Sequence, residues 1–130
     1  MKPEGLYLAP LNKGWQLTGL YEGSKEVFAK FSTSVGFPVI KLLSSVLAHD
    51  YTNIGFLVST GSEKIPERIK TMKPNSLLLH RLDTGWQVFA VYPTRRQQIM
   101  ALYEPLELSL ARKIAGIIAV NYGLSNFEED

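Results

Sequence analysis

Internal sequence similarity, between the first and second halves of the chain, is the feature that most limits how it can fold. Both tryptophans stand in the same tripeptide, Gly14-Trp15-Gln16 and Gly85-Trp86-Gln87. When the sequence is shifted by 71 positions, nine of the 46 positions from Leu6 to Tyr51 are identical, and the hydrophobic pattern agrees without a gap. Self-similarity at a fixed spacing is typical of a repeated structural unit. We therefore expect two copies of one unit.

Each copy predicts three strands followed by a helix. Two apolar runs flank a short polar turn, which is typical of a β-hairpin, and a third run follows. The apolar period then changes to the i, i+4, i+7, i+8 spacing of an amphipathic helix. The expected strands are 5–11, 14–21 and 25–32 in the first copy and 76–82, 85–92 and 95–103 in the second, and the helical stripes are Val39, Leu43, Val46 and Leu47, and Leu110, Ile114, Ile117 and Ile118.

The expected fold is α+β: a tandem β-β-β-α repeat with an offset of 71, forming a pseudo-two-fold antiparallel sheet domain with two main helices packed on it. A unit of about 60 residues buries too little apolar surface to be stable alone, so the two copies form one domain over residues 1–130. We divide it into repeat 1 (5–60), a connector (61–74), repeat 2 (75–124) and an acidic tail (125–130). A fourth strand is expected at 53–60, and a short helix from Pro66 to Met72.

Composition excludes several classes of protein. No apolar run approaches the roughly 18 residues that a membrane-spanning helix needs, so we expect no membrane partner. The chain has no cysteine, which removes disulfides, thiolate metal sites and cysteine nucleophiles and favours a reducing, cytoplasmic location. The amino-terminal residues lack the apolar stretch of a signal peptide.

Few residues of this sequence are suited to catalysis. His49 and His80 are the two histidines, and the adjacent side chains of His49 and Asp50 point in different directions on a regular helix. No Gly-x-Ser-x-Gly elbow, His-Glu-x-x-His pair, phosphate-binding glycine loop or calcium loop is present. We predict a protein that is not an enzyme, with no catalytic residue, metal site or cofactor.

The net charge is +2, but the acidic residues are unevenly distributed along the sequence. Three of the twelve acidic residues are the last three of the sequence, Glu128 to Asp130, which leaves +5 for the rest. A mild positive field favours anionic partners. The acidic tail is either a solubilising end or a segment that docks on the protein's own basic surface or on another protein.

Alternation divides the second strand of each copy into two faces. The apolar face, with a small residue at its third position, is expected to form the core, although exposed stacking tryptophans remain an alternative. The opposite face is the better candidate for binding. In the third strands, strict alternation places Phe28 on the same face as Lys30. It likewise places Arg96 on the same face as Gln98, Met100 and Leu102. The core-face residues are Trp15, Leu17, Gly19, Tyr21, Trp86, Val88, Ala90 and Tyr92, and the opposite face carries Gln16, Thr18, Leu20, Gln87, Phe89 and Val91.

Three functions fit this arrangement. A duplicated unit of antiparallel strands followed by a helix resembles, in topology alone, the Whirly and PUR-repeat proteins, which implies binding of single-stranded DNA or RNA. Aromatic side chains would stack on bases while Lys and Arg contact phosphates. The alternatives are a protein–protein adaptor or inhibitor, for example a viral one, acting through a sheet face or edge, and a small-ligand binder at the repeat interface. The oligomeric state is open. The candidate binding residues are Phe89, Tyr92, Arg95, Arg96, Arg81, Lys30, Gln16 and Gln87.

Overall fold

Strands and two α-helices make up most of the described residues, and buried and exposed side chains alternate along the hairpin strands. The computed structural model describes residues 3–11, 13–52, 56–58 and 72–130. Apolar residues at every second position of each hairpin turn to one side, where two helices cover them. In chain order the elements are β1 (Gly5–Leu11), β2 (Gly14–Tyr21), β3 (Ser24–Ser32), α1 (Phe37–Leu47), a π-helical turn (Ala48–Thr52), β4 (Phe56–Val58), β5 (Ser76–Leu82), β6 (Gly85–Val91), β7 (Arg96–Leu102), α2 (Leu108–Asn121) and β8 (Glu128–Glu129).

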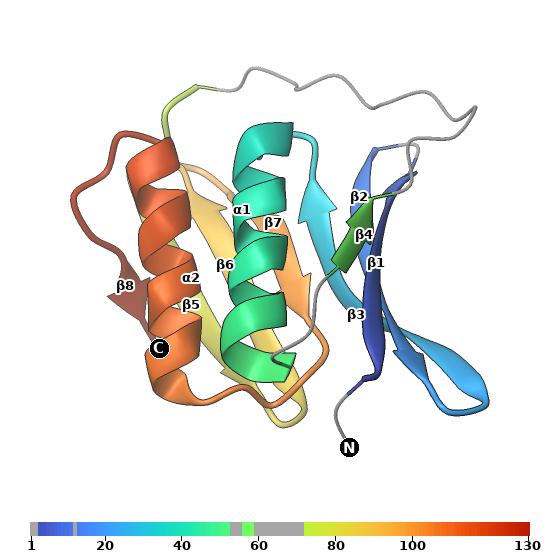
Figure 1. The fold of residues 1–130 in the computed structure, drawn as a ribbon. Coiled ribbons are helices and arrows are strands. Elements are labelled where there is room, and N and C mark those ends of the chain that lie inside the picture. Colours follow the sequence, from blue (N-terminus) through green and yellow to red (C-terminus); the bar gives the residue numbers. More distant parts are fainter. Residues whose placement is uncertain (1–2, 12, 53–55, 59–71) are drawn as a thin grey trace.

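Within the described residues, eight strands form a single sheet in the order β4-β1-β2-β3-β7-β6-β5-β8 (Figure 1). The six central strands are antiparallel, whereas β4 on β1 and β8 on β5 are parallel. The α+β class with two main helices is as predicted. The sheet is mixed rather than purely antiparallel, because the chain passes through a helix before each of the two outer strands.

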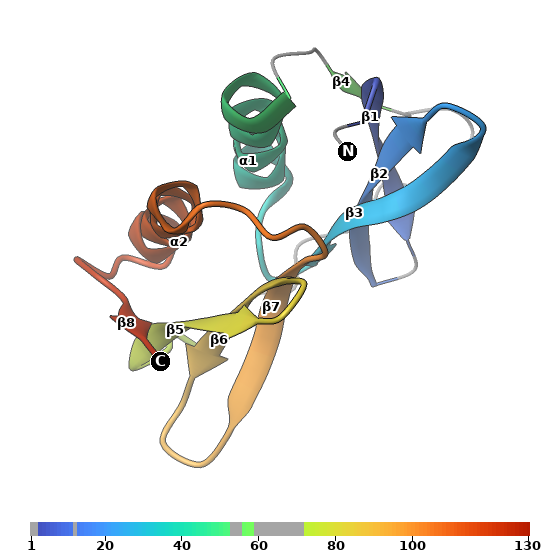
Figure 2. The same cartoon turned by 90° about the horizontal axis from the view of Figure 1, so that it is seen from below.

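A short contact between β3 and β7 joins the two halves of the sheet. This seam consists of the pairs Ala29 with Leu102, Lys30 with Ala101, and Phe31 with Met100. In Figure 2 the strands spread apart from the seam, and both helices lie on the same side of the sheet. We call the opposite side of the six central strands the open face.

Both tryptophans belong to the core, with 2% of Trp15 and 3% of Trp86 exposed. Trp15 stacks on Phe37 at the start of α1, with ring centroids 4.6 Å apart. The indole N–H of Trp86 donates to the carbonyl oxygen of Leu106 at 3.0 Å, just before α2. The interpretation of these rings as core residues is confirmed, and neither is available to stack on a ligand.

Two β-bulges correct the predicted faces of the third strands. Val27 and Ala29 pair with the consecutive residues Thr18 and Leu17, so Phe28 is an additional residue. Ile99 is the additional residue of β7, because Gln98 and Met100 pair with Phe89 and Val88. A bulge shifts the alternation by one residue. Phe28, Met100 and Leu102 are therefore buried, on the opposite side from Lys30 and Gln98.

The helices bury the predicted stripes against the sheet. Leu43, Leu47, Ile114 and Ile118 are fully buried, and Pro38 lies in the first turn of α1, where a missing N–H costs little. Among the described residues, no helix has the length and apolar character needed to cross a membrane. The predicted fourth strand is present at Phe56–Val58, while the rest of 53–60 and most of the connector, with its predicted helix, lie outside the described residues.

Candidate functional site

One row of side chains crosses the open face from β1 to β5. Strand register places Gln16 opposite Lys30, Lys30 opposite Ala101 across the seam, and Ala101 opposite Gln87. Ala9 and His80 extend the row at its two ends. Neighbouring strands lie about 4.8 Å apart, so the row spans roughly 24 Å. Three of the predicted binding residues, Gln16, Lys30 and Gln87, are thus brought together on one surface.

Side-chain amides flank the row on both sides of the seam. The amide N–H of Gln87 donates to the side-chain carbonyl of Gln98 at 2.8 Å, and that of Gln16 donates to the Thr18 hydroxyl at 3.2 Å. These side chains are exposed or half-buried, so their remaining hydrogen-bonding groups face solvent. The sequence patterns did not select Gln98 as a site residue, although alternation with Arg96 had placed it on the same face.

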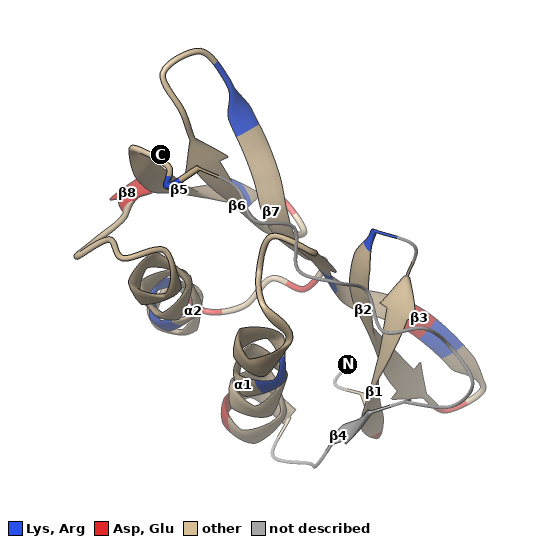
Figure 3. Cartoon of the chain, turned by 90° about the horizontal axis from the view of Figure 1, so that it is seen from above, with Lys and Arg blue, Asp and Glu red and all other residues tan. Residues whose placement is uncertain are grey.

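The ionic groups that the central strands direct to the open face are basic. Lys25 lies opposite Leu20, Lys30 opposite Gln16, and Arg96 opposite Val91. The one carboxylate in these six strands, Glu26, pairs with Gly19 on the helix side. Figure 3 shows the basic positions on β3 and at the start of β7. The open face therefore carries positive charge with no carboxylate from the six strands to neutralise it.

A shallow hollow of about 310 Å³ lies where β3 and β7 diverge beyond the seam. Its cationic lining residues are Lys13 and Lys30, and Gln98 adds an amide. Phe31 and Met100 contribute apolar surface. Two ammonium groups beside an amide are suited to an anionic group such as a phosphate. Lys13 lies in the β1–β2 turn, and the sequence had marked it only as a turn residue.

Two aromatic rings reach the open face. Phe89 is half-buried and meets His80 edge-on, with ring centroids 6.3 Å apart. Tyr7 lies opposite Thr18 on β1 and is 36% exposed. One ring in each half is therefore accessible for stacking on a planar group.

The other predicted residues lie away from this face. Tyr92 is 8% exposed, and its hydroxyl donates to the carbonyl oxygen of Met72 at 3.2 Å. The guanidinium of Arg95 lies over the Tyr92 ring at 4.3 Å from the centroid. Arg81 is opposite Trp86 on the helix side, with its guanidinium 5.3 Å from that ring. Tyr92 cannot stack on a ligand, and Arg95 and Arg81 take part in cation–π contacts within the protein.

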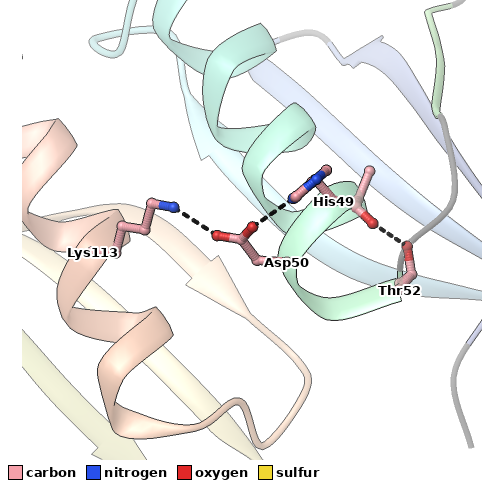
Figure 4. Close-up of polar contacts among 5 residues, drawn as sticks. His49, Asp50, Thr52 and Lys113 are labelled. Atoms are coloured by element: carbon pink, nitrogen blue, oxygen red, sulfur yellow. Dashed lines mark hydrogen bonds and ion pairs between the residues drawn. The ribbon is translucent and has the colours of Figure 1, made fainter.

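A second polar cluster joins the end of α1 to α2 (Figure 4). Asp50 accepts a hydrogen bond from the Lys113 ammonium at 2.7 Å, and its other oxygen lies 2.8 Å from His49 Nδ1. The expectation that His49 and Asp50 point apart was wrong. They lie in a π-helical turn, where each residue advances by a smaller angle than in an α-helix, so neighbouring side chains converge.

This cluster holds the helices together rather than presenting unpaired groups. The Lys113 ammonium, and secondarily His49, lower the pKa of the Asp50 carboxyl. Nearby, Glu104 accepts hydrogen bonds from the hydroxyls of Tyr21 at 2.9 Å and Tyr51 at 3.3 Å. Burial, and then the Glu104 bond, raise the pKa of Tyr21. A hollow of about 530 Å³ lies beside Asp50, Tyr51 and Lys113, where the Asp50 carboxylate is already paired with the Lys113 ammonium.

No protein-family model, curated protein or solved structure matches this chain.

Proposed function

We propose that the open face binds single-stranded nucleic acid. The observation that carries this proposal is the charge of the face: Lys25, Lys30 and Arg96 project from it, and the six central strands add no carboxylate. Basic side chains along a sheet attract the phosphate backbone, and accessible rings stack on bases irrespective of sequence. Phe89 and Tyr7 supply such rings here.

We also infer that the two halves are copies of one β-β-β-α-β unit with an offset of 71. The bulged residues Phe28 and Ile99 support this, since they are 71 positions apart. Two reciprocal contacts support it too. Tyr51, after α1, donates to Glu104 before α2, while Tyr122, at the end of α2, donates to Ser34 before α1. The two tyrosines are 71 positions apart, while Glu104 and Ser34 are one residue out of that register. An exchange of similar contacts is typical of two-fold related units.

The repeat explains the layout of the proposed interface. Gln16 and Gln87 are equivalent positions, and they flank the seam on opposite sides. Lys30 and Ala101 are equivalent too, but only the first copy places a charge at the seam. A bound strand would therefore meet amides in both halves and a central cation contributed by β3 alone.

Fluorescence anisotropy with labelled 20-nucleotide DNA and RNA strands tests the proposal. If Lys25, Lys30 and Arg96 each neutralise one phosphate, the slope of log affinity against log salt is about −2 for a single strand. Affinity then falls roughly 20-fold between 50 and 200 mM salt. Absence of binding to either oligonucleotide at 50 mM salt would contradict the proposal.

Two variants locate the interaction. Lys30→Gln is expected to reduce the magnitude of the salt slope by about 0.7, because one phosphate contact is lost. Phe89→Leu keeps an apolar side chain but removes the ring, and a stacking loss of ~1 kcal/mol or more weakens binding at least about fivefold. Lys41→Gln on α1, on the helix side, is the matched control and leaves binding unchanged. An equal loss with Lys41→Gln would place the nucleic acid elsewhere.

A further inference from the structure

The acidic segment Phe127–Asp130 lies along the outer edge of β5. Its strand β8 runs parallel to β5, with Glu128 opposite Leu78 and Glu129 opposite Leu79. The backbone N–H of Asp130 donates to the carbonyl oxygen of Leu79 at 3.2 Å. A segment rich in Glu and Asp has little intrinsic preference for a strand, so contacts at this edge must hold it there.

Phe127, Glu129 and Asp130 each have a partner in the rest of the protein. Arg112 on α2 donates to both carboxylate oxygens of Glu129, at 2.5 and 3.1 Å. His80 Nδ1 lies 2.6 Å from a carboxylate oxygen of Asp130. The ring of Phe127 packs on the core beside Gly116, where the missing side chain of α2 leaves room. The edge therefore recognises an aromatic residue followed by acidic ones.

The described strand β8 pairs with only part of this edge. Pairing ends at Leu79, whereas β5 continues to Leu82, and no described strand lies beside 80–82 on this side. Arg81 is exposed and Leu82 is 40% exposed. A longer strand in the same register would place an acidic residue near Arg81 and an apolar one on Leu82.

The acidic segment Phe127–Asp130 is also weakly held. Its ion pairs are open to solvent, with side-chain exposures of 51% for Arg112, 36% for Glu129, 38% for His80 and 47% for Asp130. Exposed ion pairs contribute little to stability, and short elements with few buried contacts open more readily than the core. A competing strand with more backbone pairing can therefore displace it.

We propose that the outer edge of β5 is a docking site for an extended acidic segment of another protein. The segment carries an aromatic residue followed by at least three acidic residues, and it adds to the sheet as a strand parallel to β5. The chain's own Phe127–Asp130 occupies the site until it is displaced. Strand addition takes its affinity from backbone hydrogen bonds and its specificity from alternate side chains. This edge adjoins the open face at His80, but the proposal does not depend on nucleic-acid binding.

Anisotropy of a fluorescein-labelled octapeptide, Ser-Asn-Phe-Glu-Glu-Asp-Glu-Val, tests the proposal on the full chain. The first six residues repeat 125–130, and the last two are designed to meet Arg81 and Leu82. Glu129→Gln weakens the internal competitor and is expected to raise peptide affinity by up to about fivefold. In the Glu129→Gln protein, Arg112→Gln is expected to lower the peptide affinity by a similar factor. The matched control is Lys113→Gln, which removes a neighbouring cation that binds Asp50 instead. It is expected to leave the peptide affinity unchanged.

The location of binding is checked by amide chemical shifts. The proposal predicts that the largest peptide-induced changes fall on 78–82 of β5 and around Arg112 of α2, and that Lys30→Gln leaves peptide binding intact. The proposal is overturned if the Glu129→Gln protein does not bind the octapeptide at millimolar concentration, or if Arg112→Gln has no effect. It is also overturned if the shifts map to β2 and β3 instead of β5, or if a peptide with every acid replaced by its amide binds equally well.

Discussion

Gly14 and Gly85 begin β2 and β6, and an alanine at either position is expected to destabilise the protein. A Cβ on Gly14 would overlap the carbonyl oxygen of Phe31, and one on Gly85 would overlap that of Leu102. Both oxygens belong to the backbone at the seam strands, so neither can rotate away as a side chain would. The strand ends must separate to admit the methyl group.

The size of the expected loss in stability follows from two opposed effects. Replacing a strand glycine with alanine removes chain entropy from the unfolded state and by itself stabilises by about 0.5–1 kcal/mol. Forcing an additional methyl group into packed structure costs about 1–3 kcal/mol. The overlap here is with backbone, which places the cost in the upper part of that range. We therefore expect a net loss of about 1–2 kcal/mol, or roughly 3–10 °C in melting temperature for a domain of this size.

Thermal unfolding followed by far-ultraviolet circular dichroism, with urea midpoints as a second measurement, tests this prediction. Gly5→Ala is the matched control, because the nearest atom to its Cβ is the flexible Leu20 Cδ1 at 3.3 Å, and its stability should change little. The two test variants should lose similar amounts, since their contacts are equivalent. Either variant matching or exceeding wild-type stability would refute the close approach at the seam.

Three further predictions concern single contacts. Trp86→Phe leaves the buried Leu106 carbonyl without its donor and is expected to cost about 1–3 kcal/mol, measured by urea unfolding. Arg112 lowers the pKa of the Glu129 carboxyl, so the docking of that segment is fully favoured above the ordinary Glu pKa and weakens as pH falls through the lowered value. Protection of the Leu79 amide from hydrogen exchange, taken at each pH relative to the intrinsic exchange rate, should fall across an acid titration. A protection factor that does not change with pH would contradict this. Asn121 has a buried amide nitrogen without a hydrogen-bond partner among the described residues, so Asn121→Leu should raise the melting temperature, and a lower value would show that the nitrogen is satisfied.

Sequence patterns predicted most of the regular structure here, because hairpin and helix periods are local properties. The strands at 5–11, 14–21 and 76–82 have the expected bounds, and the two tryptophans occupy the expected core. The bulges at Phe28 and Ile99 were missed, since an additional residue arises from pairing with a neighbouring strand and leaves no mark on the run itself. For the same reason strict alternation assigned Lys30 and Phe28 to one face of β3, whereas the bulge places them on opposite faces.

The candidate site was predictable only in part. Alternation alone assigned Gln16 and Gln87 to the open side of their strands. Lys30 joins them in one row because of the seam, which depends on how the two halves meet. Tyr92 was selected as an aromatic residue near Arg95, yet its ring is buried under that guanidinium, which residue types do not reveal. The strand β8 was not foreseen either, because its two glutamates form a strand only through β5 and Arg112.

The shortness of the seam has a consequence for how the chain folds. Within each half, β-hairpins bring together residues close in sequence, and such contacts form quickly. The seam instead joins Ala29 to Leu102 and rests on three residue pairs, so a long loop must close for few new contacts. We therefore expect each half to assemble its hairpins first and the meeting of β3 with β7 to limit the folding rate. Substitutions in the hairpins and at the seam should then both slow folding, because both are formed at the rate-limiting step, while those in parts that form later mainly speed unfolding.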